Sequence, residues 1–245
     1  MRLYSLRVYL LCVYYVVTLV PTVIGILLCW PFPHQARFFV ARTWSRGMLW
    51  AGRILCGLDW VVEGRENLPP GPSVLYIKHS SVFETYAQIG LFPRQTWVVK
   101  KEILFVPVLG WGVAAMKCIA INRGASGKAV RQVIQQGKER LAAGIWVTIF
   151  PEGTRMDRGE TRRYGISGAA LARDAGCLLV PVAQNAADFF PRSGLPERPG
   201  RIRICIGPPI DPSVQEPKET NKIAQEWIEA KMAEISEGYK NHDSS

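Results

Sequence analysis

The chain has 245 residues, of which 48% are hydrophobic, and a formal net charge of +10. The positive charge lies within residues 1–210, whereas 211–245 is net acidic, so an anionic partner is expected. The six cysteines, at positions 12, 29, 56, 118, 177 and 205, include no CxxC pair and no zinc-ligand spacing. This pattern indicates a reduced protein that faces the cytosol, without a disulfide framework or a structural metal.

The N-terminal segment is strongly apolar. No charged residue occurs from Val8 to Pro33, which covers the roughly 20 apolar residues that span a bilayer core. The run is longer than the apolar part of a signal peptide and lacks a small-residue cleavage site, so we expect it to be retained. Arginines flank it on both sides, so the positive-inside rule does not predict its orientation in a membrane. Pro21 and Gly25 are the positions at which such a helix would bend.

A second stretch, residues 36–58, mixes large apolar residues with four arginines. This composition is typical of a helix that lies in the interface plane of a membrane, where anionic headgroups attract basic side chains. We therefore expect residues 1–58 to form a membrane-anchoring helical pair dipped into one leaflet. A single membrane span and a buried soluble helix are the alternatives. The apolar segment favours lipid over nucleic acid as the anionic partner.

From residue 59 to 245 the sequence alternates between strand and helix patterns. Short apolar runs predict buried strands at 73–78, 96–99, 145–150 and 178–183, with Pro181 at a strand end or bulge. Period-two alternation at 201–206 predicts an edge strand with one wet face. Helices are expected at 82–91, 126–141 and 166–175, and an amphipathic C-terminal helix at 220–238. The predicted unit is an α/β domain with a central, mostly parallel or mixed sheet flanked by helices.

His79 and Glu84 are the candidate acid–base pair. Of the three histidines, His79 alone follows a predicted buried strand and opens a helix, and ligand sites of α/β sheets gather at the carboxyl ends of strands. Glu84, in the first turns of that helix, can fold back onto the imidazole. A carboxylate on one ring nitrogen fixes the tautomer and leaves the other nitrogen free as a base.

A second group of polar residues follows the strand at 145–150, in the segment Phe150-Pro-Glu-Gly-Thr-Arg155. Gly153 allows the backbone to approach a ligand, Thr154 offers a hydroxyl and Arg155 a planar fork suited to phosphate. No nucleophile elbow, Walker loop or dinucleotide loop is present. The pattern therefore favours direct transfer between two substrates over a covalent intermediate.

Four motif blocks resemble those of the 1-acyl-sn-glycerol-3-phosphate acyltransferases. They are His79 with Glu84, Ile119 to Arg123, Phe150 to Arg155, and Val180-Pro-Val182. The resemblance implies that His79 deprotonates the free hydroxyl of a lysophospholipid, which then attacks the thioester of an acyl-CoA or acyl carrier protein. No other cofactor and no metal are implied. The expected location is the cytoplasmic face of a bacterial inner membrane.

The resemblance also implies residue roles. Glu84 would orient His79 and balance its charge, and Val180 and Pro181 would shape the acyl site. The glycerol-phosphate end would be held by Arg123, Glu152, Gly153, Thr154 and Arg155.

Three positions differ from the family pattern. Glu84 stands where Asp is usual, Asn122 where an acidic residue is common, and Gly165 where a Lys is frequent. The last two leave open another acceptor, such as a lyso-ornithine lipid without phosphate. A non-catalytic membrane protein that binds lipid is the alternative from a different class.

Overall fold

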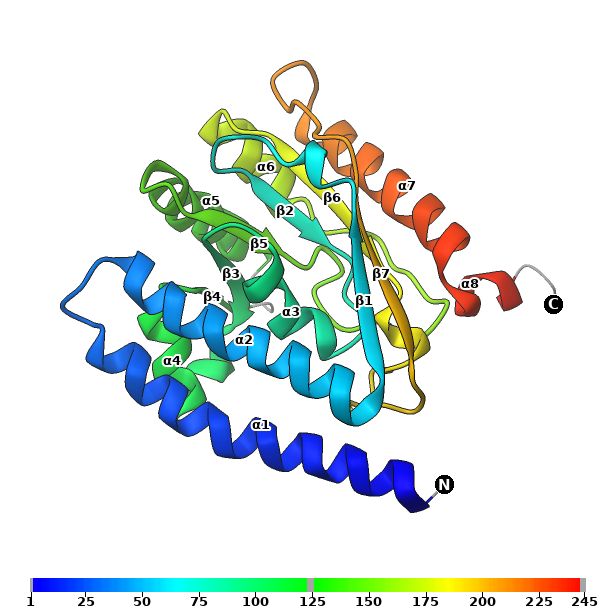
Figure 1. Ribbon diagram of the computed structural model, residues 1–245. Coiled ribbons are helices and arrows are strands. Elements are labelled where there is room, and N and C mark those ends of the chain that lie inside the picture. The colour runs from blue at the N-terminus through cyan, green and yellow to red at the C-terminus, as the bar shows by residue number, and fades with distance from the viewer. Residues whose placement is uncertain (1, 123–125, 243–245) are drawn as a thin grey trace.

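Seven strands form one sheet in residues 2–122 and 126–242, the part of the chain that the computed structural model describes. Their order across the sheet is β1-β7-β6-β2-β5-β3-β4 (Figure 1). Only the β6–β7 pair is antiparallel among these neighbours. The strands are β1 (Leu58–Glu63), β2 (Val74–Ile77), β3 (Gln95–Lys100), β4 (Ile119–Ile121), β5 (Trp146–Ile149), β6 (Leu179–Gln184) and β7 (Gly200–Ile206).

Helices cover both faces of this sheet (Figure 1). One face is covered by α1 (Arg2–Leu28), α2 (His34–Cys56), α3 (Phe83–Leu91) and α4 (Leu109–Ala115). The other is covered by α5 (Ser126–Ala142), α6 (Ser167–Ala175) and α7 (Pro217–Ile235), followed by the short α8 (Glu237–His242). Every side chain of β2, β5 and β6 is buried, as expected for parallel strands enclosed by two helical layers. The expected α/β class is confirmed.

The first two helices form an antiparallel pair that lies along the domain (Figure 1). Helix α1 contains a segment, Leu3–Leu28, with a mean hydropathy of 2.3 that is long and apolar enough to cross a membrane. It continues through Pro21. Helix α2 ends where Gly57 adopts a left-handed conformation with φ of 66°, a conformation that glycine adopts without steric cost.

Two expectations about the strands were wrong. The strand at 201–206 is β7, and it is not at the edge, because β1 pairs with it in parallel from Gly200 to Cys205. Its wet face is nevertheless present, since Arg201 is exposed and Arg203 half-buried. Pro181 lies inside β6, with Tyr76 as its partner in β2. The missing N–H is tolerated there because the pairing of β6 with β7 begins only at Val182.

The chain leaves β2 and β5, which are neighbours in the sheet, toward opposite faces. Helix α3 follows β2 and packs with α2, whereas α6 follows β5 and packs with α5 and α7. A crevice at the carboxyl ends of parallel strands is expected at such a switch point. The loops that start at Lys78 and Phe150 therefore meet at the position where a ligand site forms.

Candidate active site

His79 lies in the loop between β2 and α3, and its side chain is only 13% exposed. Its imidazole stacks on the ring of Phe150, with centroids 4.2 Å apart. The main chain is held too, because the N–H of Met156 donates to the His79 carbonyl at 2.7 Å. The ring and the backbone of His79 are thus both fixed by the segment that follows β5.

Glu84 lies in the first turn of α3 and folds back onto His79, as the sequence predicted. Its Oε1 accepts a hydrogen bond from His79 Nδ1 at 2.9 Å, and further bonds from the backbone N–H groups of Ser80 and Ser81 at 2.8 and 2.7 Å. Because a carboxylate only accepts, Nδ1 carries the hydrogen and Nε2 is left as the basic nitrogen. The pair is therefore built for general base catalysis.

The turn after β5 carries four of the five residues that the resemblance assigns to the glycerol-phosphate end, Glu152 to Arg155. Gly153 has a φ of 72°, and a Cβ there would meet no atom within 4 Å. Glycine is therefore required here by the positive φ, and not because a side chain would lack room. Thr154 and Arg155 are half-buried, and Arg155 donates to the carbonyl of Arg192 at 3.2 Å. Arg155 lines the same cavity as His79.

Glu152 occupies a different environment from its neighbours in that turn. It is 4% exposed, and its Oε1 lies 3.5 Å from Lys78 Nζ and accepts a hydrogen bond from the His79 backbone N–H at 3.2 Å. Burial raises the pKa of the Glu152 carboxyl to about 7, although the Lys78 ammonium opposes this. A buried carboxylate turned toward Lys78 and the His79 backbone is suited to holding the loop.

An apolar cavity of about 420 Å³ starts at His79. Its walls come from the two N-terminal helices, from α3, α4 and β3, and include Val23, Trp44, Tyr86, Val98 and Val113. Arg155 and Lys100 also line it. A site that combines a base, two cationic side chains and a long apolar wall suits an amphiphilic molecule with an anionic end.

The remaining predicted residues do not line this cavity or fall outside the described chain. Val180 and Pro181 are buried within β6, and Val180 belongs to the core between the sheet and α2. Their role in shaping the acyl site stays a prediction that no lining contact supports. Arg123 lies outside the described residues.

Lys78 and Lys100, at the ends of β2 and β3, were not predicted from the sequence as residues near the site. Lys78 is fully buried. The sequence feature that could have identified it is a charged residue directly after four apolar strand residues. Side chains alternate along a strand, so Lys78 and His79 leave opposite faces of the sheet. Lys100 lines the cavity, and only the parallel pairing of β3 with β5 shows that it ends beside the site.

A family model described as Acyltransferase matches residues 59–185. The chain is 40% identical over 208 residues to a 1-acyl-sn-glycerol-3-phosphate acyltransferase of Pseudomonas aeruginosa, a match that covers 83% of this chain and 81% of that protein. A yeast 1-acyl-sn-glycerol-3-phosphate acyltransferase, from Saccharomyces cerevisiae, is 30% identical over 155 residues, covering 61% of this chain and 49% of that protein.

The fold is also similar to a solved structure. The crystal structure of the 1-acyl-sn-glycerophosphate (LPA) acyltransferase PlsC from Thermotoga maritima matches with a TM-score of 0.76 and 20% identity, over 95% of both chains. The matched family segment contains His79, Glu84 and the whole turn after β5. Together with the 40% identity to the Pseudomonas protein, it shows that this chain belongs to the acyltransferase family.

Proposed function

We propose that this enzyme transfers a fatty acyl group from acyl-CoA or acyl carrier protein to the free hydroxyl of 1-acyl-glycerol-3-phosphate, making phosphatidic acid. The observation that carries the proposal is the His79–Glu84 pair, with its Nδ1–Oε1 distance of 2.9 Å, at an apolar cavity that Arg155 also lines. The relatives in Pseudomonas and yeast, both 1-acyl-sn-glycerol-3-phosphate acyltransferases, support it.

The proposed reaction is a direct transfer with His79 as general base. Nε2 takes the proton of the glycerol hydroxyl while the oxygen attacks the thioester carbonyl, forming the new C–O bond. The C–S bond then breaks, and the leaving sulfur takes the proton back from the imidazolium. Glu84 stabilises the charged imidazolium between the two steps, which is the role of a carboxylate on Nδ1. No side chain becomes acylated.

The cavity supports an acyl substrate of substantial length. Its aliphatic and aromatic lining would remove the hydrocarbon chain from water at about 0.8 kcal/mol per buried CH₂. Because residues of α1 and α2 form part of the wall, the chain would enter between the anchoring helices and the sheet. The thioester carbon then lies near His79 at the other end of the cavity.

Arg155 is expected to hold the phosphate of the acceptor. Arg155→Ala should raise the KM for 1-acyl-glycerol-3-phosphate by about 10–100-fold, because a hydrogen bond to a charged group contributes about 1.5–3 kcal/mol. The KM for 1-acylglycerol, which lacks the phosphate, should not change. Arg173→Ala is the matched control, since Arg173 pairs with Glu216 on the far helical layer. Equal KM values for wild type and Arg155→Ala would remove this residue from the phosphate site.

We infer that both N-terminal helices lie in one leaflet, on the cytoplasmic side of the inner membrane. Helix α1 packs lengthwise against the body through Val8, Leu11, Val23 and Ile26, so crossing the bilayer would carry the domain into it. Its opposite side exposes a row of apolar residues that includes Leu6, Leu10, Val13, Val17, Val20 and Ile24. Six free cysteines favour the reducing cytosolic side.

A thiol-release assay tests the proposed reaction. Purified enzyme in lipid should release free thiol from acyl-CoA or acyl carrier protein only when 1-acyl-glycerol-3-phosphate is present, with phosphatidic acid as product. A panel with lyso-ornithine lipid distinguishes the acceptors, because the departures at Asn122 and Gly165 left that acceptor open. Thiol release with the ornithine lipid alone would overturn the proposed acceptor. Binding of lysolipid without thiol release would overturn the enzyme activity itself.

A further inference from the structure

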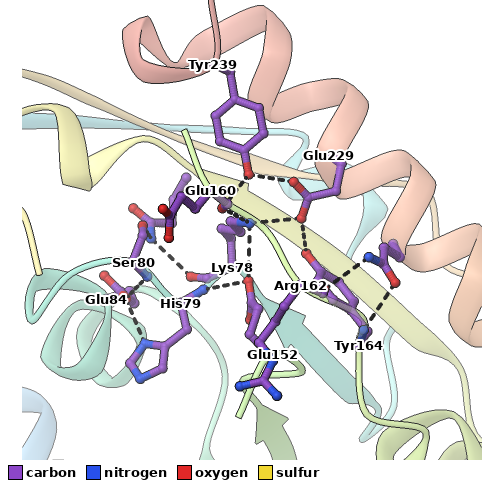
Figure 2. A network of polar contacts seen from close by, with 12 residues as sticks. Lys78, His79, Ser80, Glu84, Glu152, Glu160, Arg162, Tyr164, Glu229 and Tyr239 are labelled. Carbon is purple, nitrogen blue, oxygen red and sulfur yellow. Dashed lines mark hydrogen bonds and ion pairs between the residues drawn. The ribbon is translucent and has the colours of Figure 1, made fainter. Parts of the chain in front are cut away.

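Lys78 places a buried positive charge behind the active site. Its side chain is 1% exposed, and its Nζ lies 2.9 Å from Glu229 Oε1 and 3.5 Å from Glu152 Oε1 (Figure 2). The Nζ also donates to the carbonyl of Glu160 at 3.1 Å. A charged lysine that is buried away from water is stable only when it is paired with an opposite charge. These contacts therefore fix the ammonium at one point between the two carboxylates.

Glu152 carries this arrangement to the base. The carboxylate oxygen that faces Lys78 is the one that accepts the hydrogen bond from the His79 backbone N–H. The next segment of the same turn holds the other side of the residue, because Met156 N–H donates to the His79 carbonyl. Any movement of the Glu152 carboxylate is thus transmitted to the main chain that carries the imidazole.

Glu229 holds the far end of the network from α7. Its Oε1 accepts hydrogen bonds from Lys78 and, at 2.7 Å, from the Tyr164 hydroxyl, while Oε2 accepts one from the Tyr239 hydroxyl (Figure 2). The pKa of the Glu229 carboxyl lies below its ordinary value: burial raises it, but the Lys78 ammonium and the two hydroxyls lower it by more. Lys78, Glu152 and Glu229 are absent from the cavity lining, which does include His79.

We propose that Glu229 on α7 is a positioning residue for the acyl-transfer reaction, acting on His79 through Lys78 and Glu152. This inference rests on the proposed function in taking His79 as the base. The ion pair of Lys78 with Glu229 is shorter than its ion pair with Glu152, so Glu229 draws the ammonium away from Glu152. Without the negative charge of Glu229, Lys78 pairs with Glu152 alone and pulls that carboxylate away from the His79 backbone N–H. The catalytic loop then loses one of the bonds that set the imidazole against its substrate.

Glu229→Gln tests this directly, because the amide keeps the size of the side chain and one acceptor oxygen, which can take the place of Oε1 toward Lys78 and the Tyr164 hydroxyl. We expect kcat to fall by up to about 100-fold, because a misplacement of about 1 Å can cost roughly 10²-fold in rate. The KM for both substrates should stay unchanged, because no network residue lines the cavity. Glu226→Gln is the matched control on the same helix, since Glu226 is exposed and pairs only weakly with Lys222 at 3.8 Å. It should have wild-type kcat.

Two readouts separate positioning from a loss of folded protein. The chain has three histidines, so NMR of histidine-labelled enzyme resolves the ring of His79, identified by its loss in His79→Ala. Glu229→Gln should shift the His79 signal. The signal of His34, which bonds to the Met116 carbonyl, should stay unchanged. In a His79→Ala background, Glu229→Gln should not lower the residual rate further, because no base remains to be positioned.

The outcomes distinguish this inference from the proposed function. Wild-type kcat in Glu229→Gln, an unshifted His79 signal, or an equal loss of rate in the His79→Ala background would each overturn the positioning role. Retained activity in His79→Ala itself would overturn the base, and with it the proposed mechanism. If Glu229→Gln does not fold, Tyr239→Phe removes only one hydroxyl from Glu229. It should shift the His79 signal in the same direction by a smaller amount, with a smaller loss of kcat, and an unshifted signal there would overturn the inference.

Discussion

Replacing His79 with alanine is expected to lower kcat by about 10²–10⁴-fold, the usual contribution of a general base. His79 is the residue of the site whose basic nitrogen is free, because Nδ1 donates to Glu84. The stacking on Phe150 leaves the ring one orientation over the cavity. Steady-state thiol release with acyl-CoA or acyl carrier protein and lysophosphatidate measures the loss.

The same variant should keep its fold and its membrane affinity. His79 lies in a loop, and its side chain is not part of the buried cores that hold the sheet to its helices. Thermal unfolding and flotation with liposomes should therefore match the wild type. His34→Gln is the matched control, because the glutamine amide can still donate to the Met116 carbonyl, as His34 does. A His79→Ala enzyme with near-wild-type kcat would contradict the assigned base.

Glu84→Gln is expected to lower kcat by about 10²-fold. Two unit charges about 4 Å apart at an effective dielectric of about 20 interact by roughly 4 kcal/mol, which corresponds to about 10³ in rate before the cost of desolvation is subtracted. Glutamine keeps an oxygen that can accept from Ser80, Ser81 and His79. The loss therefore reports the missing negative charge beside the imidazolium, and pre-steady-state kinetics of acyl transfer measures it.

The control and the double variant sharpen this result. Glu139→Gln removes an exposed carboxylate that pairs with Arg140 on α5, and it should leave kcat unchanged. Because Glu84 acts through His79, the double variant Glu84→Gln/His79→Ala should be no slower than His79→Ala alone. If the two losses multiplied instead, Glu84 would have a function independent of the base.

The strands of the sheet that carry the site were predictable because each is an apolar run with polar residues after it. The runs at 73–78 and 145–150 correspond to β2 and β5, and the polar residues after them form the site. The strands β1 and β4 were missed. β1 carries charged residues at its second and last positions, Asp59 and Glu63, and β4 has only three residues. Neither gives the continuous apolar signal of a strand that is buried on both faces.

The position of β7 shows where local pattern stops being informative. Its first half alternates between arginine and isoleucine, which is typical of an edge strand, yet β1 covers its outer side. The alternation reports that one face is wet, since Arg201 and Arg203 project there. Whether another strand pairs along the edge depends on the backbone of a distant segment. The side-chain pattern of β7 therefore cannot predict that pairing.

The sequence by itself determined an apolar segment at residues 8–33, and a histidine with a carboxylate five positions later after a buried strand. These signals are local, because hydrophobic periodicity and a helix turn are set by neighbours in the chain. Only the tertiary structure decided that Glu152 turns inward to Lys78, and that Glu229 from α7 is the second carboxylate that pairs with this lysine. Such contacts join residues 74 and 151 positions apart, and their partners are chosen by which faces of the sheet the crossover helices cover.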